Sequence, residues 1–392
     1  MSDPAPWRPP SPGDRGSLAR CVGDPDAFLS ACWATAAHLR RGEDYSDLLA
    51  PADVDHLLSS TAMRYPAFRV VKDGRTLPAS ACVRSARVGS KPLTDLIDVA
   101  RVLEQFAGGA TIVLQGLHRY WQPVTRFCLD LERSLTHPVQ ANAYVTPPVS
   151  QGLRVHADPH DVFALQTHGH KQWVVHADGA DAPATLDVRL EAGDALYLPC
   201  GMAHAARTVD APSIHLTIGV RPATWADALR PLLGAVLDDS ALGEALPPGY
   251  AADPAGLAPA LAERIRQVAD RIAGAASAPL ADAAAARFWA KRTPQLAGQL
   301  VQLLDLDALD DDSVLERRAD ARLSIRRFDG RVVADLGDRQ LRMPAELEPA
   351  LRMIAAFPRL RVGDLRAHLD ERSRLVLVRR LVREALLLVV RD

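Results

Sequence analysis

Five of the chain's twelve histidines lie between residues 155 and 176, in the sequence VHADPHDVFALQTHGHKQWVVH. This stretch contains a His–x–Asp pair, His156 and Asp158, within a β-like run. Residues two apart in a strand point to the same face, so one imidazole and one carboxylate would project together. The pair alone is a weak signal, because a single histidine on a strand is more often an ordinary surface or core residue. A second element is needed before it predicts a metal site.

That second element is LEAGDALYLPCGMAHAA, which spaces Gly193, Pro199 and His204 as Gly-x5-Pro-x4-His. A glycine turn begins a strand and a proline ends it, which would carry His204 back into the same interior. Two histidines and one carboxylate form the facial triad of non-haem Fe(II) oxygenases, which leaves positions open for a cosubstrate and O₂. The sequence therefore predicts that His156, Asp158 and His204 bind a metal ion.

The other histidines of this region are assigned by their local pattern. THGHK is typical of a turn and His176 begins a polar loop, so His168, His170 and His176 are expected to be solvated. His160 is left open between an ordinary residue and a neighbour of the metal ligands. His215, in the strand-like SIHLTI, either makes a structural hydrogen bond or lines the site.

Lys171 is one of only four lysines among 46 basic residues. It lies in GHKQWVV, on a strand that follows the His–x–Asp strand and between apolar neighbours. A buried ammonium group needs an anion beside it, and a dicarboxylate cosubstrate would supply one. The alternative is an exposed lysine at a strand edge.

Composition limits the class of protein. A chain of 392 residues is long enough for two or three domains, and its hydrophobic and charged contents of 48% and 24% are those of a soluble globular protein. The net charge of −2 gives no general attraction to nucleic acid or to membranes. Five scattered cysteines without a CxxC pair predict reduced thiols and a cytoplasmic location. No apolar run reaches the length of a membrane span.

The pattern along the chain suggests four parts. Residues 1–23 are rich in Pro, Gly and Ser, which predicts a mobile arm. Residues 24–222 begin with helices over 24–60, 93–109 and 121–135. Between residues 140 and 220 follow seven short β-like runs, which are typical of a sandwich or barrel.

The two later parts differ in charge. Residues 223–312 are rich in Ala and Leu, predict helices with apolar stripes and carry a net charge of −6. Residues 313–392 carry +6, and their strands around a DG turn, three helices and final strand fit a winged helix. The helix in SRLVLVRRLVREA uses its faces for Leu and Val, which argues against nucleic-acid binding.

QANAYVTPPVSQGLRVHADPHDVFALQTHGHKQWVV and LEAGDALYLPCGMAHAARTVDAPSIHLTIGV resemble the JmjC-type ribosomal oxygenases. The resemblance implies a mixed α+β fold: a double-stranded β-helix (cupin/JmjC) with N-terminal helices, a helical dimerisation region and a C-terminal winged helix. It also implies the same three metal ligands. Lys171 would pair with the distal carboxylate of 2-oxoglutarate. Asn142 would lie near the cosubstrate on the substrate side of the site, where Tyr144 and Ser213 would contact the substrate.

Two residues depart from the family pattern. Ala157 stands where a larger residue such as Tyr is frequent, and His160 stands where acidic residues are common. Both leave the metal site plausible, but they leave the identity of the substrate residue open.

The resemblance implies a homodimeric Fe(II)- and 2-oxoglutarate-dependent dioxygenase that hydroxylates a side chain of a protein, ribosomal in this family, and forms succinate and CO₂. Two other functions stay open. One is the same chemistry on a small molecule or a biosynthetic peptide. The other is a non-enzymatic regulator in which the cupin senses a ligand and the winged helix binds DNA.

Overall fold

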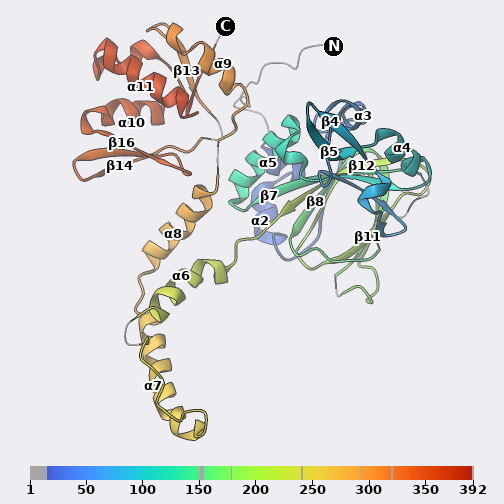
Figure 1. Cartoon of the computed structure of the whole chain (residues 1–392), viewed down its shortest axis with the longest axis horizontal. Helices are drawn as coiled ribbons and strands as arrows, with labels where there is room; N and C mark the ends of the chain where they lie inside the picture. The colour runs from blue at the N-terminus through green and yellow to red at the C-terminus, as the bar shows by residue number, and fades with distance from the viewer. Residues whose placement is uncertain are drawn as a thin grey trace. The chain divides into compact units, whose positions relative to one another are not determined.

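The computed structural model describes residues 16–148, 150, 154–177, 179–239, 242–292, 294–318 and 321–390. The chain divides into two compact units between Pro222 and Ala223, here called the β unit and the C-terminal unit (Figure 1). Within the described ranges, no helix combines the length and the apolar character that crossing a membrane would require.

The helices of the β unit begin where the sequence supplies helix-starting residues. The Asp24 side chain accepts a hydrogen bond from Ala27 N, and the Asp98 side chain accepts one from Arg101 N. The helices are α1 (Ser17–Val22), α2 (Pro25–Ala31), α3 (Pro51–Ser60), α4 (Val99–Ala107) and α5 (Gln122–Leu135).

Two predictions for this unit need correction. The expected mobile arm over 1–23 is wrong for its last part, because Ser17–Val22 forms α1 and buries Leu18 and Cys21 in the core. Residues 1–15 lie outside the described residues. The helix expected over 93–109 begins only at Val99, since the preceding residues belong to strand β5, where Ile97 is buried.

Every strand pair of this unit is antiparallel. The main sheet has the order β1-β10-β8-β12-β7-β6-β2-β3, and β9 and β11 pair with the second half of β8. The β-rich structure predicted for residues 140–220 is therefore confirmed. The strands are β1 (His38–Arg40), β2 (Phe68–Lys72), β3 (Arg75–Thr76), β4 (Val83–Val88), β5 (Lys91–Ile97), β6 (Thr111–Leu114), β7 (Val139–Thr146), β8 (Asp161–His176), β9 (Leu186–Glu191), β10 (Ala195–Leu198), β11 (Ala203–Arg207) and β12 (Ser213–Val220).

Strand β8 spans 16 residues and passes through THGHK without a turn, so the predicted turn is wrong. The register between β12 and β8 shifts at Ile214/His215, where Thr167 has no partner. One extra residue in a strand reverses which side chains face inward. Accordingly Val162, which precedes the bulge, faces the same interior as Lys171 and Trp173, which follow it.

The two faces of β8 belong to different cores. Phe163 packs against the N-terminal helices, with its ring 6.0 Å from Phe28 and 4.9 Å from Tyr197. On the other face, Val162, Trp173 and neighbouring strands form a smaller apolar cluster inside the curved sheet. The sheet thus separates a helix-covered core from an interior that also contains polar groups.

The C-terminal unit contains the long helices and two small sheets, with strand orders β17-β13-β18 and β14-β15-β16. The DG hairpin, helices over 344–357 and 373–385 and the final strand were predicted from the sequence, whereas β13, β16 and β17 were not. Residues 362–367 form a 3₁₀ helix. The elements are α6 (Trp225–Leu237), α7 (Pro254–Ala273), α8 (Ser277–Ala290), α9 (Gln299–Leu304), β13 (Val314–Arg317), β14 (Ser324–Phe328), β15 (Arg331–Asp335), β16 (Gln340–Pro344), α10 (Glu348–Ala356), β17 (Arg359–Arg361), α11 (Glu371–Arg383) and β18 (Leu387–Val390).

Candidate metal centre and its cavity

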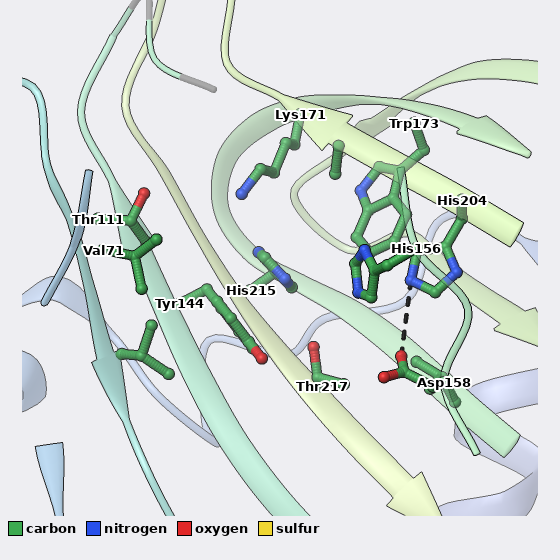
Figure 2. Close-up of a pocket in the computed structure, with 13 residues that line it drawn as sticks. Val71, Thr111, Tyr144, His156, Asp158, Lys171, Trp173, His204, His215 and Thr217 are labelled. Atoms are coloured by element: carbon green, nitrogen blue, oxygen red, sulfur yellow. Dashed lines mark ion pairs between the residues drawn. The ribbon is translucent and has the colours of Figure 1, made fainter. Parts of the chain in front are cut away.

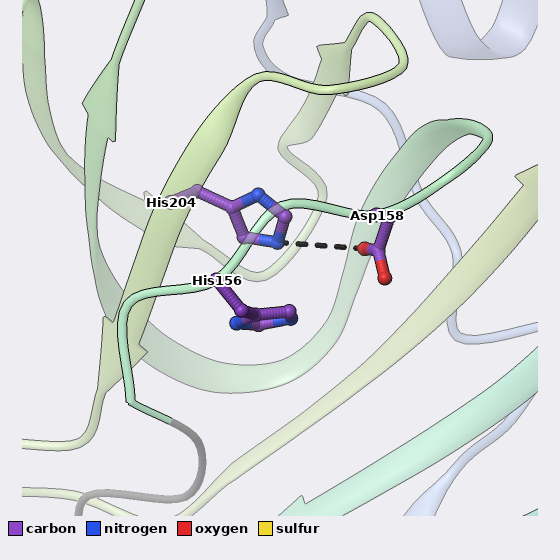
Figure 3. Close-up of side chains that lie close together, drawn as sticks. All are labelled: His156, Asp158 and His204. Carbon is purple, nitrogen blue, oxygen red and sulfur yellow. Dashed lines mark ion pairs between the residues drawn. The ribbon is translucent and has the colours of Figure 1, made fainter. Parts of the chain in front are cut away.

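His156, Asp158 and His204 lie together on two backbone segments that run side by side (Figure 3). His204 is on β11, and His156 forms an isolated antiparallel bridge with it, with N–O distances of 3.0 and 2.8 Å. Asp158 follows in a loop, where its backbone carbonyl accepts a hydrogen bond from Gly201 N at 2.9 Å. A few backbone hydrogen bonds therefore hold all three side chains in place.

The three side chains can share one metal ion. One ligand atom from each lies within 4.8 Å of the others, and His204 Nε2 is 3.6 Å from Asp158 Oδ2. His156 Nδ1 is 2.9 Å from the Arg154 carbonyl oxygen, and His204 Nδ1 is 3.0 Å from that of Met202. A carbonyl only accepts, so each Nδ1 carries the hydrogen and each Nε2 keeps its lone pair for a metal.

Burial supports the ligand form of His204. Its side chain is 4% exposed, and this burial lowers the pKa of the imidazole below its ordinary value. The indole of Trp173 stacks on it at 5.8 Å between ring centroids. His204 is therefore neutral near pH 7, as a metal ligand must be. His156 and Asp158 are half-buried and face a cavity.

The cavity extends from this cluster into the curved sheet (Figure 2). Apolar and polar side chains share its wall, and the polar groups come from several strands. The lining residues are Val71, Thr111, Val113, Tyr144, His156, Asp158, Val162, Lys171, Trp173, His204, Ala206, His215 and Thr217.

Lys171 reaches into the cavity from β8, on the side away from Asp158 (Figure 2). Its side chain is 3% exposed, and Nζ donates a hydrogen bond to Thr146 Oγ1 at 3.1 Å. Thr111 Oγ1 lies 3.2 Å from the same hydroxyl. No carboxylate pairs with Lys171 among the residues that the structure describes. Burial lowers its pKa to about 7, so an anion in the cavity would favour the charged form.

His215 and Tyr144 form the wall between these two ends. Their rings stack at 4.9 Å with planes 6° apart. Burial, reinforced by Lys171, holds the pKa of His215 well below its ordinary value, and its Nδ1 has no hydrogen-bond partner among the described residues. Burial also raises the pKa of Tyr144, against the effect of nearby Arg69. The structure therefore places His215, whose role the sequence left open, in the cavity wall.

Asn142 and Ser213 are not among the residues that line the cavity. Asn142 Oδ1 accepts a hydrogen bond from Gly116 N at 2.9 Å. Ser213 Oγ accepts one from Gln166 Nε2, also at 2.9 Å, and is fully buried. Asn142 lies two residues before Tyr144 on β7, and Ser213 lies two residues before His215 on β12. The side-chain oxygen of each already accepts a hydrogen bond from within the protein.

The remaining histidines of the quoted stretch lie outside the cavity. His170 Nε2 bonds to Asp210 and its Nδ1 lies 2.9 Å from Arg189 Nη2, so it belongs to an outer polar network. His176 Nδ1 is 2.7 Å from the Ala182 carbonyl oxygen. His160 is half-buried, with Nδ1 3.2 Å from the Asp161 carbonyl oxygen. His168 is exposed.

Sequence reasoning missed Thr111, Thr146, Trp173 and Thr217. A usable signal existed for Thr146, because it lies two residues after Tyr144 on one strand and therefore on the same face. Thr111 comes from a strand distant in sequence, so only the pairing of β6 with β7 brings it near Lys171.

Comparisons with known proteins agree with this architecture. Residues 118–228 match the JmjC domain family. A Branchiostoma floridae protein named bifunctional lysine-specific demethylase and histidyl-hydroxylase NO66 is 35% identical over 235 residues, which are 57% of this chain and 36% of that protein. Human ribosomal oxygenase 1 is 28% identical over 232 residues, or 53% and 35% of the two chains. The matches thus span little more than a third of these relatives.

Solved structures resemble almost the whole chain. The Escherichia coli ribosomal oxygenase YcfD aligns with a TM-score of 0.52 and 17% identity, covering 94% of this chain and 98% of the other. A structure of the same protein with cobalt and 2-oxoglutarate aligns with a TM-score of 0.51 and 18% identity, covering 93% and 97%. The mixed α/β, cupin-like fold is therefore confirmed.

Proposed function

We propose, from its similarity to the JmjC-type ribosomal oxygenases, that the chain is an Fe(II)- and 2-oxoglutarate-dependent oxygenase that hydroxylates a side chain of a protein substrate. The single observation that carries the proposal is that one cavity contains both the His-Asp-His cluster and the buried Lys171. The described residues thus supply separate groups for a metal and for an anion.

The donor set fits Fe(II). Two neutral imidazoles and one carboxylate are the ligands of the non-haem iron facial triad, and they leave coordination positions for a cosubstrate and O₂. The carbonyl groups of Arg154 and Met202 fix the histidines in the tautomer that binds through Nε2. A structure of the E. coli neighbour contains cobalt and 2-oxoglutarate, which supports the same pairing of metal and cosubstrate here.

The lysine end fits the far carboxylate of 2-oxoglutarate. Lys171 offers an ammonium group, and the hydroxyls of Thr146 and Thr111 lie beside it. Charge-assisted hydrogen bonds to a carboxylate in such a dry site are strong. When bound, iron, 2-oxoglutarate and O₂ supply an oxidant for a C–H bond, while the cosubstrate becomes succinate and CO₂. Trp173 and the valines of the wall keep bulk water away from this chemistry.

The protein substrate is proposed to be ribosomal because several relatives are named ribosomal oxygenases. The hydroxyl of Tyr144 orients a substrate side chain in this proposal. Burial raises the pKa of that hydroxyl, and the charge of Asp158, which lies near Tyr144, raises it further. In this proposal Ser213 acts only by joining β12 to Gln166 of β8, and Asn142 only by holding Gly116 beside β7.

The test measures two products in one incubation. Ribosomal proteins from cells that lack this protein are treated with the Fe(II)-loaded chain, 2-oxoglutarate and O₂, and succinate and peptide masses are recorded. We expect succinate together with a +16 Da peptide, and neither product with the His204→Ala variant.

Other outcomes decide between the remaining functions. Succinate with a small-molecule product, but without a modified protein, would support the alternative substrate class. A formaldehyde product with loss of 14 Da from a methylated lysine would indicate demethylation. A chain that forms no succinate but binds one DNA sequence would be the non-enzymatic regulator.

We also propose that helices of residues 223–312 form a homodimer contact. On α6, Trp225, Leu229, Leu233 and Leu237 repeat at four-residue spacing, and Trp225 is 84% exposed. A stripe of this kind is typical of a helix that packs on a partner. The winged helix of residues 313–392 stays a proposal, supported by the helices α10 and α11 against the β17-β13-β18 sheet.

A further inference from the structure

The sheet β14-β15-β16 of the C-terminal unit has two different faces. On one face, Val332, Ala334, Leu341 and Met343 join the apolar core, and α10 lies beside this sheet (Figure 1). Because side chains alternate along a strand, the residues between them form the opposite face. That outer face is where the charged side chains gather.

Three arginines lie side by side on the outer face. In the strand register, Arg326 pairs with Val333 and Val333 pairs with Arg342, so the two arginines flank one valine. In the next row Arg331 pairs with Phe328. All three arginines are exposed, whereas Val333 is only 1% exposed. Neighbouring side chains therefore cover Val333, as arginine stems do when they lie along a sheet.

The charge of this cluster is not neutralised nearby. None of the three guanidinium groups forms an ion pair with a carboxylate in the described ranges. Arg326 donates instead to Gln340 Oε1 at 3.3 Å. Asp335, one row further along this face, accepts from Gly337 N and from the Gln340 amide. Three adjacent like charges in this arrangement favour a polyanion.

Phe328 adds a second kind of contact. Its ring is 55% exposed, and the Arg326 guanidinium carbon lies 5.6 Å from the ring centroid. An exposed aromatic ring beside arginines on a β-sheet offers a stacking surface for a base and forks for the phosphates that flank it. A surface that bound only acidic groups would not require an exposed aromatic ring.

We propose that the outer face of β14-β15-β16 binds single-stranded RNA. The site contacts phosphates through Arg326, Arg331 and Arg342 and stacks a base on Phe328. Single strands are favoured over a duplex because the exposed arginines and Phe328 lie on a sheet face, whereas α11 buries Leu377 and Leu381 rather than offering a helix to a groove. The choice of RNA over DNA rests on the proposed ribosomal substrate.

This inference differs from the expectation that nucleic acid is not bound. That expectation rested on the helix predicted over 373–385, which is observed as α11 and buries its apolar face. Strand β16 was not predicted from the sequence, so Arg342 was not expected beside Arg326.

The test is fluorescence anisotropy with the full chain and a labelled RNA of about 12 nucleotides, without iron or 2-oxoglutarate. The outcome is therefore independent of whether the oxygenase proposal holds. We expect the triple variant Arg326→Glu, Arg331→Glu, Arg342→Glu to weaken binding at least about tenfold and to remove most of the salt dependence. Phe328→Ala should weaken binding about fivefold or more.

A matched control changes the same charge elsewhere in the unit. Arg359, Arg372 and Arg383 are exposed and lie on β17 and α11. Changing all three to Glu alters the net charge equally, so the loss of RNA affinity in this control measures the effect of net charge alone and should be about twofold. Equal losses in both triple variants would overturn the proposal, as would no RNA binding by the wild-type chain. Tighter binding of oligoglutamate, or of DNA with the same sequence, would assign the face to an acidic protein or to DNA instead.

Discussion

The two ends of the cavity hold their functional side chains in different ways. At the metal end, His156 lies in an isolated bridge and Asp158 in a loop, and both are half-buried. At the other end, Lys171 is buried on β8 between paired strands and bonds to Thr146. Placement at the first end depends on a few local backbone hydrogen bonds, whereas at the second it depends on strand register. The metal end should therefore tolerate substitution without unfolding, and changes at the lysine end should affect both ligand affinity and stability.

The largest effect is expected at the metal end. His204→Ala or His156→Ala removes a ligand of a preformed site, so 2-oxoglutarate turnover should fall to background. Succinate formation measures the loss, and circular dichroism checks that the fold is retained. Wild-type turnover in either variant would show that the cluster does not bind the catalytic metal.

The next effect is expected at Lys171. Lys171→Ala should raise the KM for 2-oxoglutarate by about two to four decades, since losing one partner of a buried ion pair costs about 3–5 kcal/mol. Fe(II) affinity should stay nearly unchanged. Titration of 2-oxoglutarate with iron saturating gives the KM.

Lys171→Arg serves as the conservative variant and should be only partly active, because a planar fork does not replace a compact ammonium. If both variants keep a KM within about twofold of the wild type, Lys171 does not contact the cosubstrate.

A pH effect on stability distinguishes the lysine end further. Burial lowers the pKa of Lys171 from 10.5 to about 7 in the folded apo protein. Between these values the unfolded chain binds a proton that the folded chain does not. The free energy of unfolding should therefore rise with pH across this window, by at most about 1.4 kcal/mol per pH unit from this group.

Urea titrations of the wild type and of Lys171→Met at several pH values measure this contribution. The difference between the two proteins should change with pH from about 7 to 10 and be flat below about 7. A difference that is flat throughout would mean that Lys171 is hydrated in the folded protein.

A smaller effect is expected for Thr146→Val. The substitution removes the hydroxyl that bonds to Lys171 Nζ while keeping the side chain's size. We expect the KM for 2-oxoglutarate to rise about three- to tenfold, as the loss of one hydrogen bond predicts. The exposed, unrelated Thr35→Val is a matched control and should leave the KM unchanged.

The smallest effect on the cavity is expected from the α6 stripe. Leu229→Glu with Leu233→Glu should convert the proposed dimer to monomers by light scattering, because charges disfavour an apolar contact. Both ends of the cavity should keep their ligand affinities. A wild-type chain that is already monomeric at micromolar concentration would contradict the dimer.

The parts of the site that could be predicted are those with a local sequence signal. His156 and Asp158 are two residues apart, and Gly193, Pro199 and His204 mark one strand and its return. Lys171 was found because lysine is rare in this chain. The family resemblance supplied the order of the larger parts. These signals did not depend on knowing which strands pair.

The parts that failed depend on contacts between distant segments. The expected turn at THGHK is continuous strand because β12 pairs with His168 and Gly169, and β9 pairs with His170 and Lys171. Thr111 joins Lys171 only through the pairing of β6 with β7. Asn142 is not among the residues that line the cavity, and its amide oxygen accepts a hydrogen bond from Gly116 N. None of these partners is near in sequence.

Because of the bulge in β8, the number of residues in this strand determines which side chains face the cavity. Val162 before it and Lys171 after it face the same interior, although nine positions separate them and an unbroken strand would turn them to opposite sides. A deletion of one residue between Gln166 and Gly169 would therefore turn Lys171 outward and bring the neighbouring Gln172 inward, without changing either residue. Gly169 also has φ +61 and lies against the Pro212 carbonyl, where a Cβ would collide. Among homologous chains, we expect insertions and deletions to be excluded from this segment and gathered in the loops before and after it.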